Sequence, residues 1–268
     1  FGNFIFLDPK SMKEIAHAPD LNSLQHKIME VTDESFRYHI ERNHISKWLN
    51  ARALFPIAEK IKYLTTGDFK NLDEIRRYIF DTIAQYRLNK GRGVIAEYDR
   101  HRFDEYTIFS RIGNGSIGGK ARGLAFIDSM IKKNNIMNMW DDVVVTIPRT
   151  VVLTTDVFDE FMEDNNLYRV ALSNLTDDEI LKHFINSRLP YRIHEDLLAF
   201  ISVINNPVAV RSSSLLEDSH YQPFAGVYST YMIPNNHDDE NVLLFQLGNA
   251  IKSVYASVFY KFSKAYMK

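Results

Sequence analysis

Hydrophobic residues in the first hundred positions return at the spacing of helices. Apolar side chains recur about every 3.6 residues over residues 36–64, and a second stripe of the same kind covers residues 72–86. Asn71, with Glu74 three positions later, is typical of the N-terminal cap of a helix. A short apolar run at residues 4–7 favours a strand or an extended lead-in. We therefore expect a mainly helical segment, which we place at residues 1–104.

The pattern changes after residue 104, where apolar runs of strand length alternate with helical stripes. A strand-like run at residues 106–109 leads into a glycine-rich turn and an amphipathic helix, and the run at residues 143–147 is typical of a buried strand. Further strands are expected at residues 150–153, 207–211 and 227–233, and further helices at residues 155–165, after Thr176 and at residues 241–267. Strands mixed with helices favour a layered α+β or α/β domain, here over residues 105–268.

Composition excludes several classes of protein. Apolar residues make up 45% and charged residues 25% of the 268 positions, which argues against a disordered chain. The net charge of −2 provides no positive field for nucleic acid or anionic lipid, and no apolar stretch approaches the length of a membrane span. Cysteine is absent, which removes disulfides and thiolate sites and suits a reducing cytoplasm. We expect a cytoplasmic protein that binds neither nucleic acid nor membrane.

The glycine-rich turn at residues 113–120 has the character of an anion site. Glycines let the backbone approach a phosphate, and the free N–H groups at the start of the following helix point towards it. Lys120, in the first helical turn, adds a positive charge. The turn therefore predicts phosphate binding.

This turn has three other interpretations, and the residues present argue against the first two. Its glycines match the dinucleotide fingerprint, but no acidic residue follows the second strand to take the ribose. A P-loop needs a glycine where Asn114 stands and a hydroxyl where Ala121 stands. The third interpretation is an ordinary loop with a helix cap.

A second polar group follows the predicted strand at residues 207–211. Arg211 stands at the end of that strand, where a fixed backbone would aim its guanidinium out of the sheet, and this suits bidentate recognition of phosphate. Three serines follow, then Glu217 and Asp218, then a small-residue turn at residues 225–226. Taken singly, the serines could equally be a loop or an N-cap, the acidic pair a solvated turn, and Phe224 a core residue.

Taken in order, the motifs are similar to those of a known family. The sequence GGKARGLA, a strand ending at Pro148, VRSSS with the acidic pair, and FAGVYST together resemble the nucleotide-binding domain shared by phosphoenolpyruvate synthase, pyruvate phosphate dikinase and their relatives. The resemblance covers roughly residues 110–268. It implies an α+β fold, the N-terminal subdomain of an ATP-grasp-like domain with a mixed sheet and helices, preceded here by an all-helical segment.

The resemblance also implies which residues bind ATP and magnesium. Lys120 and Arg211 match positions that contact the phosphates. The other implied contacts lie in the loops around them: Gly118, Gly119, Gly226 and Thr230, with Ser212, Glu217 and Asp218 as further contributors. Magnesium is implied as a cofactor, with ligands beyond Lys268. The scattered histidines, such as His39 and His44, lack the spacing of a metal pair.

The family's reaction implies partners outside these residues. ATP gives a phosphoryl group to a histidine on a separate domain, which carries it to pyruvate or another acceptor, so that ATP and pyruvate become AMP and phosphoenolpyruvate. A second ATP-grasp subdomain, a phosphohistidine domain and an acceptor domain are absent from this sequence. Since it begins with Phe1, we expect a piece of a longer phosphotransferase that is inactive alone. The alternative is a non-catalytic nucleotide-binding or regulatory module with the same fold.

Overall fold

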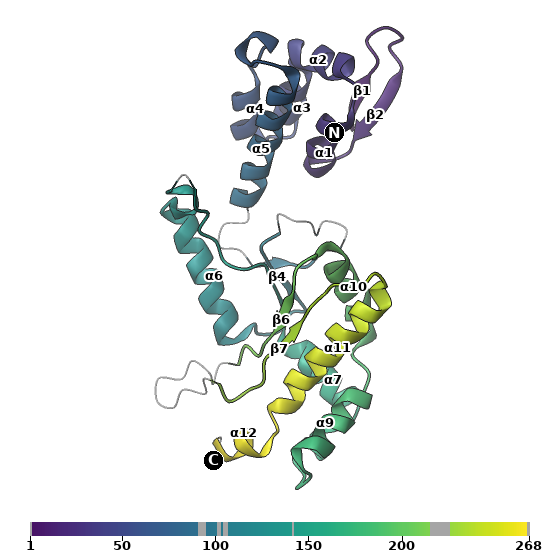
Figure 1. Cartoon of the computed structure of the whole chain (residues 1–268), viewed down its shortest axis with the longest axis vertical. Helices are drawn as coiled ribbons and strands as arrows, with labels where there is room; N and C mark the ends of the chain where they lie inside the picture. The colour runs from purple at the N-terminus through teal and green to yellow at the C-terminus, as the bar shows by residue number, and fades with distance from the viewer. Residues whose placement is uncertain are drawn as a thin grey trace. The chain divides into compact units, whose positions relative to one another are not determined.

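The structure, a computed structural model, describes residues 2–90, 95–100, 103, 107–140, 142–214 and 226–266. The chain divides into two compact units, Phe1–Lys90 and Gly91–Lys268 (Figure 1). The sequence-based boundary at residue 104 lies further along the chain. Tyr98 and Phe103 pack in the core of the second unit, and so the contacts draw the division before them.

Unit 1, Phe1–Lys90, is helical apart from a two-stranded antiparallel sheet at its start. Strands β1 (Phe4–Leu7) and β2 (Glu14–Ala18) pair with Phe4 opposite Ala18, and the pattern indicated only the first of them. The helices are α1 (Leu21–Glu30), α2 (Asp33–Glu41), α3 (His44–Ala51), α4 (Phe55–Ile61), η1 (Thr66–Asp68) and α5 (Leu72–Lys90). The segment is therefore mainly helical, as predicted, but not all-helical.

The longest helix of unit 1 follows directly from its sequence. Ile75, Ile79 and Ile83 recur every four residues and are fully buried. The Asn71 side chain accepts a hydrogen bond from the N–H of Glu74 at 2.9 Å, which confirms the predicted cap. Pro56 lies in the first turn of α4, where a missing N–H costs nothing, and it therefore begins a helix rather than kinking one.

Unit 1 holds a buried histidine, His39, next to a partly buried one, His44. His39 is 2% exposed, and its Nε2 accepts a hydrogen bond from the N–H of Leu7 at 3.0 Å. Neutral His39 therefore carries its proton on Nδ1 and donates it to Nδ1 of His44, 3.0 Å away. Burial, with the nearby charge of His44, lowers the pKa of His39 to about 4.

Unit 2, Gly91–Lys268, contains two small sheets. Strands β3 (Ala96–Glu97), β4 (Phe109–Ile112) and β5 (Thr150–Leu153) form a parallel sheet in that order, and β6 (Val208–Val210) pairs antiparallel with β7 (Tyr231–Ile233). The helices are α6 (Gly118–Lys133), η2 (Ile136–Asn138), α7 (Thr155–Asp164), α8 (Leu167–Ala171), α9 (Asp177–Asn186), η3 (Tyr191–Ile193), α10 (His194–Val203), α11 (Glu240–Ser257) and α12 (Lys261–Tyr266). The predicted α+β class is confirmed.

One predicted strand of unit 2 is wrong. Residues 143–147 form no strand, and Val143 and Val144 are 53% and 69% exposed. The sheet uses β5 instead, which begins at Thr150 and was also predicted. The capping box at Thr176 and Glu179 is confirmed at the start of α9.

Helix α11 is the central helix of unit 2, where it packs on the pair of strands β6 and β7 and on α9 and α10 (Figure 1). Its buried side chains include Leu243, Leu247 and Ile251. Within the described residues, Glu240–Ala265 is the one stretch long and apolar enough to cross a membrane, a test that the core helix of a globular protein also passes. Because 56% of its apolar 18-residue stretch is buried inside the unit, we interpret it as a core helix.

Candidate functional site

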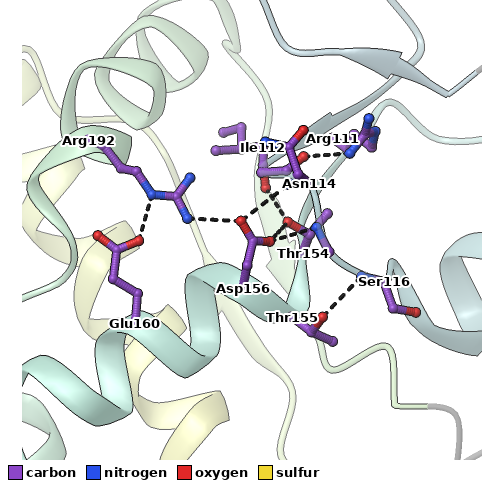
Figure 2. Close-up of polar contacts among 11 residues, drawn as sticks. Arg111, Ile112, Asn114, Ser116, Thr154, Thr155, Asp156, Glu160 and Arg192 are labelled. Atoms are coloured by element: carbon purple, nitrogen blue, oxygen red, sulfur yellow. Dashed lines mark hydrogen bonds and ion pairs between the residues drawn. The ribbon is translucent and has the colours of Figure 1, made fainter.

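The glycine-rich turn lies where two parallel strands end. Strand β4 ends at Ile112 and runs into the turn, while β5 ends at Leu153 and runs into α7. Because β4 and β5 are parallel and paired, with Ile112 opposite Leu153, their two following connections start side by side. Figure 2 shows the resulting contacts between the turn and the first residues of α7.

Asp156, at the start of α7, binds the backbone of the turn. Its carboxylate accepts hydrogen bonds from the N–H groups of Gly115 at 2.8 Å and Asn114 at 3.2 Å, and from the hydroxyl of Thr154. The next N–H of the turn, that of Ser116, donates to Oγ1 of Thr155 at 3.0 Å (Figure 2). Three successive N–H groups of the turn are therefore satisfied by α7.

Arg192, from η3, holds the Asp156 carboxylate from the other side. It donates to Asp156 at 3.1 Å and, through Nε, to Glu160 at 2.6 Å (Figure 2). Burial acts to raise the pKa of Asp156. The hydrogen bonds from the Thr154 hydroxyl and from the turn, together with the Arg192 charge, outweigh burial and hold that pKa well below its usual range. Asp156 is therefore charged at neutral pH.

Two glycines of the turn are required by α7 itself. A Cβ added at Gly113, where φ is +102°, would lie 2.0 Å from Oγ1 of Thr154, and one at Gly115 would lie 2.5 Å from Oγ1 of Thr155. The close neighbour of these glycines is therefore a protein segment. We expected Gly113 and Gly115 to make room for an anion, but the atoms next to them belong to the start of α7 and the residue before it.

The start of α6 is capped by the segment that follows β6. The N–H of Gly119 donates to the Ser213 carbonyl at 3.1 Å, and the N–H of Ala121 donates to the Ser213 hydroxyl at 3.0 Å. A Cβ at Gly118, where φ is +74°, would lie 1.3 Å from the same carbonyl oxygen. The sequence predicted free N–H groups at this helix start, and that prediction is wrong for Gly119 and Ala121.

The contact at Ser213 lies beside a second contact, which brings Lys120 to the backbone next to Arg211. Lys120 is partly buried, and its ammonium donates to the carbonyl of Ser212 at 3.3 Å, directly after Arg211. Val210 pairs with Tyr231, so Arg211, which follows Val210, and Thr230, which precedes Tyr231, are both exposed at the same end of the strand pair. The structure thus joins the α6 start to the end of the β6–β7 pair.

The other predicted site residues are placed less closely or are not described. Gly226 is exposed with φ of +78°, and among the described residues, apart from its chain neighbours, no atom lies within 4 Å of an added Cβ. Glu217 and Asp218 lie outside the described residues. Among the residues that the structure does describe, no group of three or more His, Asp or Glu side chains could hold a metal ion. The magnesium ligands implied by the resemblance lie beyond Lys268, so magnesium binding stays a prediction.

Sequence reasoning missed Asp156, Arg192 and Glu160. The sequence around Asp156 carried one local signal: the Thr and Asp residues at 154–156 are typical of the start of a helix. Nothing local indicated that the same residues would cap the glycine turn. Arg192 and Glu160 carried no signal beyond their charge.

The glycine turn thus lies at the carboxyl end of the parallel strands β4 and β5, and the Lys120 ammonium lies at the end of β6, next to Arg211. The model of one protein family matches residues 114–268, and it is described as the AMP/ATP-binding domain of pyruvate phosphate dikinase. The match covers more than half of the chain, which therefore belongs to this family, and the predicted resemblance is confirmed. No curated protein and no solved structure matches the chain.

Proposed function

We propose that this chain is the ATP-binding part of a dikinase-type phosphotransferase similar to phosphoenolpyruvate synthase. In the complete enzyme, ATP and pyruvate would yield AMP and phosphoenolpyruvate through a phosphohistidine on a domain outside these residues. The observation that carries the proposal is the hydrogen bond from the Lys120 ammonium to the Ser212 carbonyl, next to Arg211, inside a domain of an AMP/ATP-binding family. We also propose that the protein works in the cytoplasm.

The chemistry of these side chains suits a polyphosphate. A lysine supplies a compact charge with three donors, and an arginine supplies a planar fork that matches phosphate oxygens. Thr230, which precedes β7, adds a hydroxyl at the end of the β6–β7 pair where Arg211 follows β6. In phosphoryl transfer, groups of this kind position the nucleotide and neutralise its charge, while the covalent change occurs between phosphate and acceptor. Magnesium, when bound, would neutralise further phosphate charge.

Nucleotide titration tests this proposal. We expect Lys120→Ala and Arg211→Ala each to weaken ATP binding about 10- to 100-fold, because each removes a charge-assisted contact. Lys133→Ala is the matched control, since Lys133 is an exposed lysine at the other end of the same helix. Equal ATP affinity in all three variants would contradict the proposed site.

One observation favours the alternative of a nucleotide-binding or regulatory module without catalysis. Five N–H groups of the glycine turn and the α6 start already donate to Asp156, Thr155 or Ser213, namely those of Asn114, Gly115, Ser116, Gly119 and Ala121. An enzyme that used these donors on phosphate would have to release them first. The complete protein distinguishes the two functions: AMP production from ATP supports the phosphotransferase, whereas ATP binding without AMP production supports the module.

A further inference from the structure

The Asp156 carboxylate occupies the position in which a glycine-rich turn usually binds an anion. Successive backbone N–H groups in a tight turn form a concave site for a negative charge. Here the N–H groups of Asn114 and Gly115 both point at one carboxylate, which belongs to the same chain (Figure 2). The side chain is 37% exposed, and the turn and Arg192 together satisfy both of its oxygens.

The backbone carbonyl groups of the turn also accept hydrogen bonds. The Arg111 guanidinium donates to the carbonyl of Gly113 at 2.6 Å, and the N–H of Thr155 donates to the carbonyl of Ser116 at 3.0 Å. Since Ser116 in turn donates to the Thr155 hydroxyl, these two residues are joined in both directions. The turn is therefore fixed to α7 by several bonds, of which those to Asp156 are the charged ones.

The fixed turn leads straight into the helix that carries Lys120. Only Ser116 and Ile117 separate Gly115 from the first residue of α6, and Lys120 is the third residue of that helix. Asp156 holds the chain before this helix, and Ser213 holds the helix start. The direction in which α6 leaves the sheet, and hence the place of the Lys120 ammonium, depends on both contacts.

We propose that Asp156 is a positioning residue for ATP binding: it is the internal anion of the glycine turn, and it acts on ATP through Lys120. This proposal rests on the proposed function of Lys120. It assigns the N–H groups of Asn114 and Gly115 to a protein carboxylate and leaves recognition of phosphate to the side chains at the α6 start and the β6 end. Asp156 itself touches no nucleotide.

Helix α7 supplies a matched control. Glu160 lies one helical turn after Asp156 and binds the same guanidinium, but the structure shows no bond from Glu160 to the turn among the described residues. Glu160→Gln therefore removes one charge from the same surface and leaves the turn contacts in place. Asp156→Asn is the conservative variant, since its amide oxygen can still accept from Gly115.

Amide hydrogen exchange on the full chain tests the first half of the proposal without nucleotide. In Asp156→Ala we expect the N–H groups of Asn114 and Gly115 to exchange at least about 10-fold faster. The N–H of Ser116, which donates to Thr155, is the internal reference and should change less. Asp156→Asn should fall between the alanine variant and the native chain, and Glu160→Gln should match the native chain.

A double-mutant cycle with ATP tests the second half. If Asp156 acts through Lys120, Asp156→Ala should weaken ATP binding about 5-fold or more, and the double variant with Lys120→Ala should bind no more weakly than Lys120→Ala alone. Asp156→Asn should recover part of the loss, and this variant carries the test if the alanine variant does not fold. Additive losses, or unchanged exchange at Asn114 and Gly115, would overturn the proposal.

The two proposals fail in different ways. Faster exchange in Asp156→Ala combined with normal ATP binding in Lys120→Ala would contradict the proposed function, and with it the role of Asp156 in ATP binding. Normal exchange in Asp156→Ala combined with weak ATP binding in Lys120→Ala would contradict only the role of Asp156.

Discussion

Charged side chains bind backbone groups in both units of this protein, and Arg76 in unit 1 and Asp156 in unit 2 do so in different settings. In unit 1 the Arg76 guanidinium is 4% exposed and donates to the carbonyls of Ile28 and Val31 at the end of α1, and to the Asp33 carboxylate at 2.9 Å. In unit 2 the Asp156 carboxylate accepts from N–H groups and stays partly open to solvent.

The Arg76 contact serves the fold alone, whereas the Asp156 contact lies next to the candidate site. Arg76 satisfies orphan carbonyls at a helix end, inside a closed core, where its charge is useful only to the fold. Asp156 does the same for orphan N–H groups at the point where the chain enters α6, close to the predicted phosphate-binding residues. We therefore expect changes in unit 1 to alter stability alone, and changes at the turn to alter both stability and ATP binding.

The largest effect is expected at the closest backbone contact of unit 2. Gly118→Ala should destabilise unit 2 by about 4 kcal/mol, because the new Cβ would overlap the Ser213 carbonyl and φ is +74°. Gly123→Ala is the control on the same helix, where an added Cβ meets nothing within 4 Å, and it should stabilise by about 0.5–1 kcal/mol. Denaturant unfolding of both variants measures the difference.

The second largest loss of stability is expected when the buried Arg76 of unit 1 is removed. Arg76→Ala leaves two carbonyls without their donor and a space inside the unit, and should cost about 3 kcal/mol of stability in unit 1. ATP affinity should stay unchanged, which a titration checks. A loss of ATP binding in a folded Arg76 variant would break the comparison between the units.

The histidine pair sharpens the comparison through pH. The pKa of His39 is lowered to about 4 in the folded state, so below pH 6.5 the unfolded chain binds a proton that the folded chain does not. Unit 1 should therefore lose stability, by about 1–3 kcal/mol, as the pH falls from about 6.5 to 4. The low pKa of Asp156 places its own loss of stability at more acidic pH, below the usual carboxyl range.

Substitution of His39 shows whether this pH dependence has the stated origin. His39→Gln removes the titrating group, and its amide oxygen can still accept from the Leu7 N–H. The stability of this variant should change less between pH 6.5 and pH 4 than that of the native chain. An unchanged slope would assign the pH dependence to other groups.

The smallest effect is expected at a helix cap far from the site. Thr176→Ala removes the hydroxyl that bonds Glu179 in the capping box of α9 and should cost about 1 kcal/mol. Thermal unfolding of unit 2 measures this loss, and ATP affinity should not change. A change in ATP affinity would show that the site is sensitive to any loss of stability.

Local patterns predicted the elements whose stabilising contacts are local. The stripe of α5 and the caps at Asn71 and Thr176 were identified because the interacting residues lie three or four positions apart. The apolar run at residues 143–147 was misread, because hydrophobicity alone does not show whether a run will be covered.

Of the two long-range contacts at the candidate site, one was expected from the sequence and the other was not. The meeting of Lys120 with the end of β6 was expected only through the resemblance to a family, since 92 positions separate Lys120 from Ser212. Asp156 was not predicted, because its contact with Gly115 spans 41 positions and depends on the pairing of β4 with β5. No spacing rule along the chain encodes that approach.

The bond between Gly115 and Asp156 has a consequence for how glycine signatures are used in sequence searches. Such a signature records that something comes very close to the main chain, and it is silent on whether the neighbour is a cofactor or another loop. In homologues of this protein, the residue at the position of Asp156 should vary together with the residue at the position of Gly115. A pattern that scores both positions jointly would separate such self-bound turns from true dinucleotide folds.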